Sequence, residues 1–262
     1  MELDIYQVDA FARALFRGNP AAVVPLKAWL DDIVMQQIAE ENNLAETAFF
    51  VRSGADYHIR WMTPKVEVDL CGHATLAAAH CLFHHLGETR TQITFHSRSG
   101  PLVICRKSPG YEMDFPLDHP QQSEADAQHI QSICPARKEP YYRGKDDYLV
   151  IMNDEDEVRL FNPDLAKIAQ LKARGLIISA LGSTCDFVSR CFFPSYGIDE
   201  DPATGSAHTL LAPFWSQQLG KTDLSARQLS TRVGEINCRL SPDRVYLQGC
   251  AITYMTGKIY IE

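Results

Sequence analysis

DYHIRWMTPKVEVDLCGHATLAA, at residues 56–78, returns in altered form as DFVSRCFFPSYGIDEDPATGSAHTLLA at residues 186–212. Each copy begins with Asp and an aromatic residue, and each continues through an Arg and a Pro at the same spacing. Arg60 and Arg190 are 130 residues apart, and the glycines that follow them are 133 residues apart. Because this offset is close to half of the 262 residues, the repeat predicts two similar modules in one chain.

Each copy ends in a Gly-X-Ala triplet that opens an apolar run, at residues 72–74 and 205–207. This pattern predicts the start of a helix, where several backbone N–H groups lack partners and the helix dipole adds positive charge. Glycine lets a ligand approach that backbone closely, so two such turns suit a carboxylate held between the modules. We therefore predict that four residues of these turns bind substrate: Gly72, Ala74, Gly205 and Ser206.

The helices that follow the two triplets are predicted to lie at the centre of their modules. ATLAAAHCLFHHLG (residues 74–87) carries almost no charge, and a helix that is apolar on every side is buried. HTLLAPFWSQQLG (residues 208–220) has the same character, and Gly87 and Gly220 are predicted to end the two helices. Surrounding segments of alternating polarity predict strands. The fold class is therefore α+β, with two pseudo-symmetric modules, each a curved, mostly antiparallel sheet wrapped around a central helix.

Two further helices and the module boundaries are predicted from local patterns. Residues 28–43 fit an amphipathic helix with Ile33 and Ile38 on its apolar face, and a short helix is expected near residues 163–173. HPQQSEADAQHIQSICP (residues 119–135) is polar and flanked by prolines, as expected where the chain crosses between modules. We predict a first module of residues 1–118, completed by a C-terminal strand at 251–262. Residues 119–250 form the second, and the active site lies in the cleft between them.

Composition limits the classes of function. Acidic residues outnumber basic ones by 33 to 25, which gives a net charge of −8. Without a long run of Lys and Arg, the chain is not expected to bind nucleic acid. The N-terminus is acidic and alternating, unlike a signal peptide, and no apolar stretch approaches the roughly 18 residues that span a bilayer. We predict a soluble, cytoplasmic protein without membrane contact, whose eight cysteines are reduced thiols.

Glu46 is a candidate general acid or base. It stands in the segment LAETAFF (residues 44–50), where apolar neighbours would keep water away from the carboxyl group. Such an environment suits proton transfer near neutral pH. The alternative is a carboxylate at a strand edge that faces water.

The two helix starts supply further candidates. Asp201 precedes the second start and is either a catalytic group or a capping carboxylate. His73 lies at the first start and is either a proton shuttle, since histidine titrates near neutral pH, or a polar residue at a helix entrance. Ser206 is a ligand contact or a cap by the same reasoning.

Cysteine and histidine raise two other possibilities. Cys71 precedes the first helix, where a helix N-terminus lowers a thiol pKa and favours a nucleophile or an acid/base group. The second copy has no cysteine in its turn, so a mechanism with two thiols is not supported. His73, His80 and His84 fall near one helix face, but no Cys or carboxylate set completes a metal-ligand spacing, and no metal site is predicted. No nucleotide-binding or hydrolase motif is present, so no cofactor is predicted.

Five segments, in this order, are similar to the motifs of the phenazine biosynthesis-like (PhzF) family: VDAF (8–11), GNPAAV (18–23), ETAF (46–49), EVDLCGHAT (67–75) and DPATGSA (201–207). They span almost the whole chain, and the last two are the most specific. The resemblance implies the diaminopimelate epimerase-like fold and a homodimer. It also implies a cofactor-independent isomerase in which Glu46 shuttles a proton between carbon atoms of the substrate, supported by His73, Asp201 and Ser206.

The sequence therefore favours an isomerase that relocates a proton on a small carboxylate-bearing substrate. Glu46, His73 and Asp201 are its predicted catalytic residues. One alternative is an epimerase or racemase that uses Cys71 with Glu46 or Asp201 on the opposite face of the substrate. The other is a binder of small carboxylates without catalytic activity, although such a binder has no need of a base.

Overall fold

The computed structural model describes residues 1–137 and 140–262, and the chain divides into two compact units. The first unit comprises Met1–Asp114 and Gln248–Glu262, and the second comprises Phe115–Leu247. The chain leaves the first unit within β8 (Tyr111–Pro116) and re-enters it within β17 (Arg244–Gly249). The sequence predicted these junctions at residues 118/119 and 250/251.

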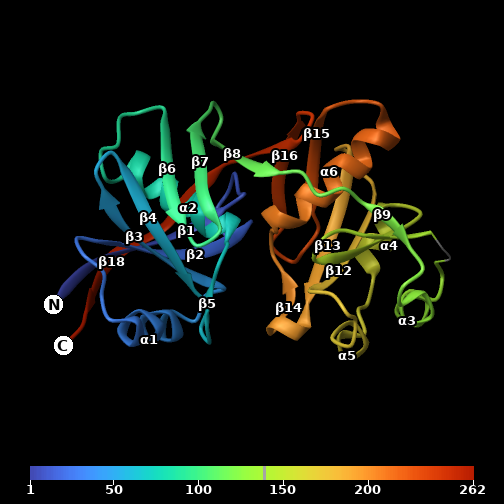
Figure 1. The fold of residues 1–262 in the computed structure, drawn as a ribbon, viewed down its shortest axis with the longest axis horizontal. Helices are drawn as coiled ribbons and strands as arrows, with labels where there is room; N and C mark the ends of the chain where they lie inside the picture. The colour runs from blue at the N-terminus through green and yellow to red at the C-terminus, as the bar shows by residue number, and fades with distance from the viewer. Residues whose placement is uncertain (138–139) are drawn as a thin grey trace. The chain divides into compact units, whose positions relative to one another are not determined.

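The first unit is built from strands around the apolar helix α2. Figure 1 shows α2 among these strands and the two chain ends side by side, because β1 and β18 pair in antiparallel fashion. Besides β8 and part of β17, its elements are β1 (Glu2–Ala10), β2 (Asn19–Leu26), α1 (Asp32–Asn42), β3 (Glu46–Ser53), β4 (Asp56–Met62), β5 (Glu67–Val68), α2 (Gly72–His84), β6 (Gln92–Ser97), β7 (Gly100–Arg106) and β18 (Ala251–Tyr260).

The central residues of strands β2 and β3 are apolar because a helix covers each face of the pair. They run parallel, with Ala21 opposite Glu46 at one end. Ala22, Val24 and Phe49 pack against α1 in one hydrophobic cluster. Since side chains alternate along a strand, the residues between them face the other way, where α2 contacts β1, β2 and β3. Such two-sided burial is typical of parallel strands.

The second unit repeats this arrangement. Besides the end of β8 and most of β17, its elements are β9 (Gln121–Ser123), α3 (Ala127–Ile133), β10 (Tyr141–Arg143), β11 (Asp147–Ile151), α4 (Glu155–Leu160), α5 (Leu165–Ile168), β12 (Gly175–Leu181), β13 (Phe187–Phe193), the 3-10 turn η1 (Pro194–Tyr196), β14 (Ile198–Asp201), α6 (Gly205–Leu219), β15 (Asp223–Gln228) and β16 (Gly234–Leu240). The helices α3, α4 and α5 pack on β11, β12 and β13, and α6 contacts β15 and β16.

The strand pairings show that the two units have the same internal order. β2–β3 and β11–β12 are parallel pairs, each joined by helical segments. β4–β6 and β13–β15 are also parallel, and each pair is joined through a short strand and a central helix. Antiparallel pairings join other neighbours, such as β3–β4 and β12–β13. The predicted fold class, two similar modules with curved, mostly antiparallel sheets around central helices, is confirmed.

Several helix limits differ from the sequence predictions. α2 ends at His84 with His85 as its C-cap, and Gly87 takes a left-handed φ of 72° in the turn beyond. α6 ends as predicted, because Gly220 adopts the left-handed conformation and its N–H bonds to Ser216 O. In α1 the buried positions are Met35, Ile38 and Ala39. Ile33 is exposed because, at roughly 100° per residue, it lies on the opposite side of the helix from Met35.

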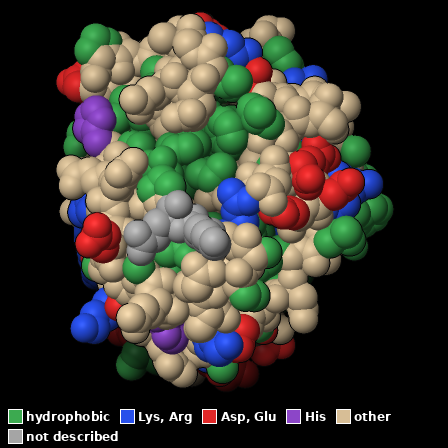
Figure 2. All heavy atoms as spheres, turned by 90° about the vertical axis from the view of Figure 1, so that its right-hand side faces the viewer, with side chains coloured by type: hydrophobic (Ala, Val, Ile, Leu, Met, Phe, Trp, Pro, Cys, Tyr) green, Lys and Arg blue, Asp and Glu red, His purple; other side chains and the backbone are tan. Residues whose placement is uncertain are grey.

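The polar segment at residues 119–135 is not a bare connection. It contains β9 and α3, and it belongs to the second unit. The predicted helix near 163–173 is the single turn α5, and the charged stretch before it forms α4, where Arg159 pairs with Glu155 at 2.5 Å. Figure 2, which faces this unit, shows hydrophobic side chains near its centre with acidic and basic groups beside one another around them, as on a solvated surface.

Helix length and polarity bear on membrane contact. In the described ranges, 1–137 and 140–262, no helix is both long and apolar enough to cross a bilayer.

Candidate active site

Glu46 is the first residue of β3 and lies opposite Ala21 of β2. Because this strand pair is covered on both faces, the strand takes the carboxylate into the interior, and Glu46 is only 8% exposed. The alternative of a strand-edge carboxylate facing water is wrong.

His73, in the first turn of α2, meets this carboxylate. Its Nε2 lies 3.0 Å from Oε2 of Glu46. On the other side of the ring, Nδ1 lies 3.1 Å from Nδ2 of Asn19, the first residue of β2. The imidazole is therefore held from both sides, and both His73 and Asn19 are buried.

The contact between Glu46 and His73 is close but not aligned as a hydrogen bond. Within the described part of the chain, Oε2 of Glu46 is a buried oxygen without a hydrogen-bond partner. A buried polar atom of this kind loses hydration without compensation, so it calls for an explanation such as a catalytic role or a bound water or ion. The carboxylate thus has lone pairs available for a proton or another cation.

The charges around His73 favour its protonated form. Burial acts against the charged ring, whereas the Glu46 carboxylate favours it, and the pKa of His73 is raised above its ordinary value; the Cys71 thiol, protonated near neutral pH, adds no charge there. A carboxylate beside an imidazolium provides a proton acceptor and a proton donor in one contact.

Cys71 completes the group from the N-cap position of α2. Its Sγ lies 3.5 Å from Nδ1 of His73. Burial, together with the charge of Glu46, raises the pKa of the Cys71 thiol to about 11, although His73 acts against this rise. The expectation that the helix N-terminus lowers the pKa of this thiol is wrong, because desolvation of the thiolate is the larger effect.

Gly72 and Ala74 form the first turn of α2 beside His73. The Cys71 side chain does not cap this helix, and the first intrahelical bond runs from Thr75 N to Cys71 O at 3.1 Å. The N–H groups before that bond are the ones that a helix leaves for ligands. Substrate binding by Gly72 and Ala74 stays a prediction.

The first unit also contains a set of atoms suited to a metal ion. Glu46, Cys71 and His73 are all buried, and each has one ligand atom within 4.8 Å of the others. The sequence spacing of the histidines did not indicate this set, because Glu46 comes from β3, whereas Cys71 and His73 lie at the start of α2.

His80 and His84 do not share a site with His73. In His80, Nδ1 lies 3.0 Å from the Tyr111 hydroxyl and Nε2 lies 2.9 Å from Thr253 Oγ1. Burial, with His84 and His85 nearby, lowers the pKa of His80 to about 4. These histidines form a separate cluster at the end of α2, where the rings of His80 and His84 stack with their centroids 5.1 Å apart.

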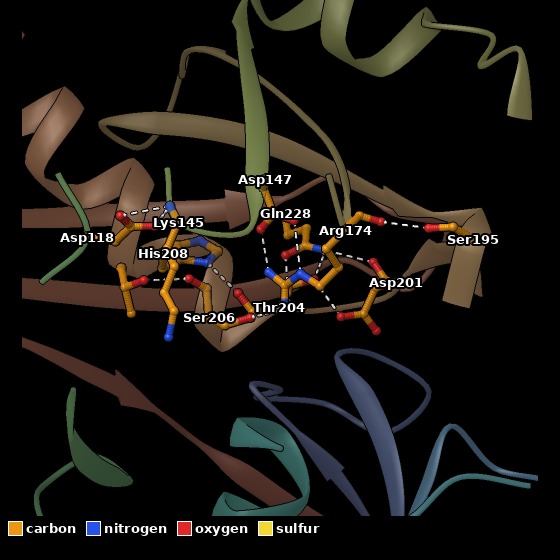
Figure 3. Close-up of polar contacts among 11 residues, drawn as sticks. Asp118, Lys145, Asp147, Arg174, Ser195, Asp201, Thr204, Ser206, His208 and Gln228 are labelled. Atoms are coloured by element: carbon orange, nitrogen blue, oxygen red, sulfur yellow. Dashed lines mark hydrogen bonds and ion pairs between the residues drawn. The ribbon is translucent and has the colours of Figure 1, made fainter. Parts of the chain in front are cut away.

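In the second unit, Asp201 ends β14 and is held in a hydrogen-bond network (Figure 3). Its Oδ2 accepts a bond of 2.5 Å from Thr204 Oγ1, and its backbone oxygen accepts one of 2.6 Å from Gln228 Nε2. Gln228 Oε1 also accepts a bond of 2.8 Å from Thr204 N. Thr204, the N-cap of α6, therefore connects the helix start to β14 and to β15, where Gln228 lies.

Ser206 lies in the first turn of α6 beside a buried ion pair. Arg174 Nη1 donates to Ser206 Oγ at 2.9 Å, and Arg174 Nε donates to Asp147 Oδ1 at 2.9 Å. A second bond joins Arg174 Nη2 to Asp147 Oδ2, so the pair is bidentate. Burial raises the pKa of Asp147, and Arg174 only partly offsets this rise. Figure 3 shows the guanidinium directed toward Asp147 and the start of α6.

Sequence reasoning did not single out several residues that contact the predicted ones: Asn19, Asp147, Arg174, Thr204 and Gln228. Asn19 and Thr204 stand inside segments that resemble family motifs, so position within a motif was an available signal. The other three come from strand ends distant in sequence, and only the strand pairings bring them to α6.

The fold of the two units defines the class of protein, and similarity to known sequences identifies that class as an isomerase family. Residues 8–257 match the family described as phenazine biosynthesis-like protein, and the chain belongs to this family. Two uncharacterised isomerases of Pseudomonas aeruginosa are 48% and 47% identical to it, with 100% of each chain covered. The chain is therefore an enzyme of an isomerase family.

Solved structures agree with this assignment. A PhzF family protein of Enterococcus faecalis is 42% identical and superimposes with a TM-score of 0.96, with 100% of both chains covered. A probable proline racemase of Agrobacterium radiobacter has the same fold at 8% identity, with a TM-score of 0.65 over 99% of this chain and 93% of that one.

Proposed function

We propose that this enzyme relocates a proton on a small carboxylate-bearing substrate by cofactor-independent acid/base catalysis, with Glu46 as the base. The observation that carries the proposal is the buried Oε2 of Glu46, 3.0 Å from His73 and without an aligned donor in the described residues. A base needs a free lone pair in a site that excludes bulk water, and Glu46 offers one.

In this mechanism Glu46 removes a proton from a carbon that is activated by conjugation and returns it to another carbon of the same molecule. His73, as an imidazolium, stabilises the negative charge that develops while the proton is on Glu46. Asn19 holds the ring of His73 in place through its contact with Nδ1. The first-turn N–H groups at Gly72 and Ala74 bind the substrate carboxylate.

Whether Asp201, Gly205 and Ser206 act on the same substrate as Glu46 stays a prediction. In that prediction, Asp201 stabilises or relays charge during proton transfer, and Gly205 and Ser206 bind the substrate carboxylate. Replacing Ser206 by Ala would then raise KM for a carboxylate substrate and leave KM for its uncharged amide analogue unchanged. A homodimer also stays a prediction, which sedimentation equilibrium can test against the chain mass of 29.4 kDa.

A panel of small unsaturated carboxylates in heavy water tests the proposal. We expect at least one compound to gain deuterium, or to shift a double bond, with the wild-type enzyme and not with Glu46→Gln. Glu41→Gln, an exposed change of the same type, is the matched control and should behave as wild type. Near-full turnover by Glu46→Gln on a confirmed substrate would show that Glu46 is not the base.

The second candidate is an epimerase that uses Cys71 as one of two proton-transfer groups. It is favoured by the 3.5 Å contact between Cys71 Sγ and His73 Nδ1. Deuterium would then appear at a stereocentre of an otherwise unchanged compound, and Cys71→Ser would be inactive.

A further inference from the structure

We propose that Glu46, Cys71 and His73 form a binding site for Zn²⁺, and that the bound ion inhibits the enzyme. Inhibition presupposes the proposed role of Glu46 as the base, whereas binding of the ion does not. All three side chains belong to the first unit, so the site is complete within that unit.

The donor set matches the chemistry of zinc. Zn²⁺ is bound by thiolate, imidazole and carboxylate groups, and sites with three protein ligands leave a fourth position for water or substrate. Cys71, His73 and Glu46 supply one group of each kind, and all three are buried. A softer thiolate combined with imidazole disfavours Mg²⁺ and Ca²⁺, which prefer oxygen ligands.

The three donor atoms lie within 4.8 Å of one another, which is wider than in a formed tetrahedral site. Usual zinc–ligand bond lengths place two donor atoms roughly 3.3–3.6 Å apart. His73 Nε2 lies 3.0 Å from Glu46 Oε2 and 4.0 Å from Cys71 Sγ. The sulfur lies nearer to Nδ1, at 3.5 Å, so a shared ion on Nε2 requires the Cys71 side chain to rotate toward Glu46.

Two features of the surroundings support an ion at this position. Metal-bound histidines have their second nitrogen in a hydrogen bond, and Asn19 already lies 3.1 Å from His73 Nδ1. In the structure the NH2 group of Asn19 faces Nδ1, and a half-turn of the amide would present its oxygen to the Nδ1–H of a metal-bound ring. Glu46 Oε2, which no group in the described residues bonds, is the oxygen that faces His73 Nε2.

Binding exchanges protons for the ion without any redox step. Cys71 releases its thiol proton to solvent as the sulfur–zinc bond forms, and His73 releases any proton on Nε2. The ion then occupies the lone pair with which Glu46 would accept the substrate proton. Its open coordination position also lies where the substrate would approach. The same three residues thus have two states, a metal-free acid/base state and a metal-bound inactive state.

Cobalt spectroscopy of the full chain tests binding without any substrate. Co²⁺ replaces Zn²⁺ in such sites, and a cobalt–thiolate bond gives a charge-transfer band in the near ultraviolet. We expect one equivalent of Co²⁺ to produce this band and Zn²⁺ to displace it. Cys71→Ser should abolish the band. Glu46→Gln should keep it but weaken binding by more than the roughly 10–100-fold that loss of a supporting partner costs.

The matched controls remove the same chemical groups elsewhere in the first unit. Cys105→Ser removes a partly exposed thiol, and His84→Gln removes an exposed imidazole from the histidine cluster at the end of α2. Both should keep the wild-type band and the wild-type affinity. Binding is refuted if the wild type gives no band, if the band persists in Cys71→Ser, or if either control abolishes it. Circular dichroism shows that each variant is folded, and Glu46→Gln provides the test should Cys71→Ser unfold.

The inhibitory effect has its own readout. Zn²⁺ should stop deuterium exchange on a confirmed substrate, and a chelator should restore it. Exchange that continues at saturating Zn²⁺ would overturn inhibition while leaving binding intact. If no substrate depends on Glu46, the proposed function fails, but the cobalt band still decides whether the ion binds.

Discussion

The starts of α2 and α6 hold equivalent places in two units that share one strand order, but their chemistry differs. At α2, Glu46 has a buried oxygen without an aligned donor in the described residues, next to His73. At α6, the carboxylate of Asp201 accepts a hydrogen bond from the Thr204 hydroxyl, and Gln228 Oε1 accepts one from the Thr204 backbone N–H. Groups with unmet bonding and opposite charge can exchange protons, whereas a satisfied network fixes a shape. Under the proposed function, this difference assigns proton transfer to the start of α2.

The equivalent strands β3 and β12 also differ at their first residue. Glu46 opens β3, and the position that opens β12 in the same way is Gly175. A Cβ at Gly175 would lie 2.0 Å from Phe192 O, so no side chain fits there. The neighbouring Arg174 instead binds Asp147 and Ser206. The two units, which share one strand order, therefore carry different chemical groups at the first residue of this strand.

Removing the base should have the largest effect. Glu46→Gln is expected to lower the exchange rate by about 10²–10⁴-fold, because the neutral amide cannot accept the proton. Steady-state kinetics on a compound from the deuterium screen measures this loss. The fold should survive, since the amide has almost the same shape, and a matching circular dichroism spectrum would show it. A loss below tenfold would mean that the contrast between the two helix starts does not reflect catalysis.

Breaking the ion pair of the second unit should cost stability. Arg174→Met leaves Asp147 buried without its partner, and loss of one member of a buried pair costs about 3–5 kcal/mol. We expect a value near the lower end because the Arg174 side chain is 25% exposed. Urea unfolding measures this loss. Arg227→Met, which removes an exposed pair with Glu235, should cost less than about 1 kcal/mol. Equal losses for the two variants would contradict a supporting role for Arg174.

Acid should destabilise the fold of the second unit through His208, which is fully buried in α6. Burial lowers the pKa of His208 to about 4. The unfolded chain binds the proton near pH 6.5, so stability is full above that value and is lost as the pH falls toward 4. The loss is about 3 kcal/mol for this group. His208→Asn, which keeps a donor for Thr204 O, should flatten urea-unfolding stability over this range; an unchanged slope would contradict the assignment.

Much of the fold was predictable because the two repeats carry their pattern locally. The Gly-X-Ala turns at Gly72 and Gly205 open α2 and α6, and the apolar runs after them are the buried helices. Burial of Glu46 was not decided by its own segment. It follows from the parallel pairing of β3 with β2 and from the helices on both faces.

What sequence could not provide are contacts between distant strand ends. Asp147 and Arg174 meet because β11 and β12 pair in parallel, and no local pattern marks that register. Gln228 reaches Thr204 because β15 lies beside β13. Local rules also failed where two effects compete. The helix N-terminus should lower the pKa of Cys71, but burial raises it.

Replacing the thiol of the first unit should have the smallest effect, and it separates the two candidate mechanisms. With burial raising the pKa of Cys71 to about 11, the thiol stays protonated near neutral pH and does not serve as a base. Cys71→Ser should therefore lower the exchange rate by only about 2–10-fold, the equivalent of one hydrogen bond of about 0.5–1.5 kcal/mol. Cys105→Ser is the matched control and should leave the rate unchanged. A loss comparable to that of Glu46→Gln would instead mean that proton transfer needs two groups, as in an epimerase. The essential asymmetry would then lie within the first helix start itself, between Glu46 and Cys71 on the two sides of His73.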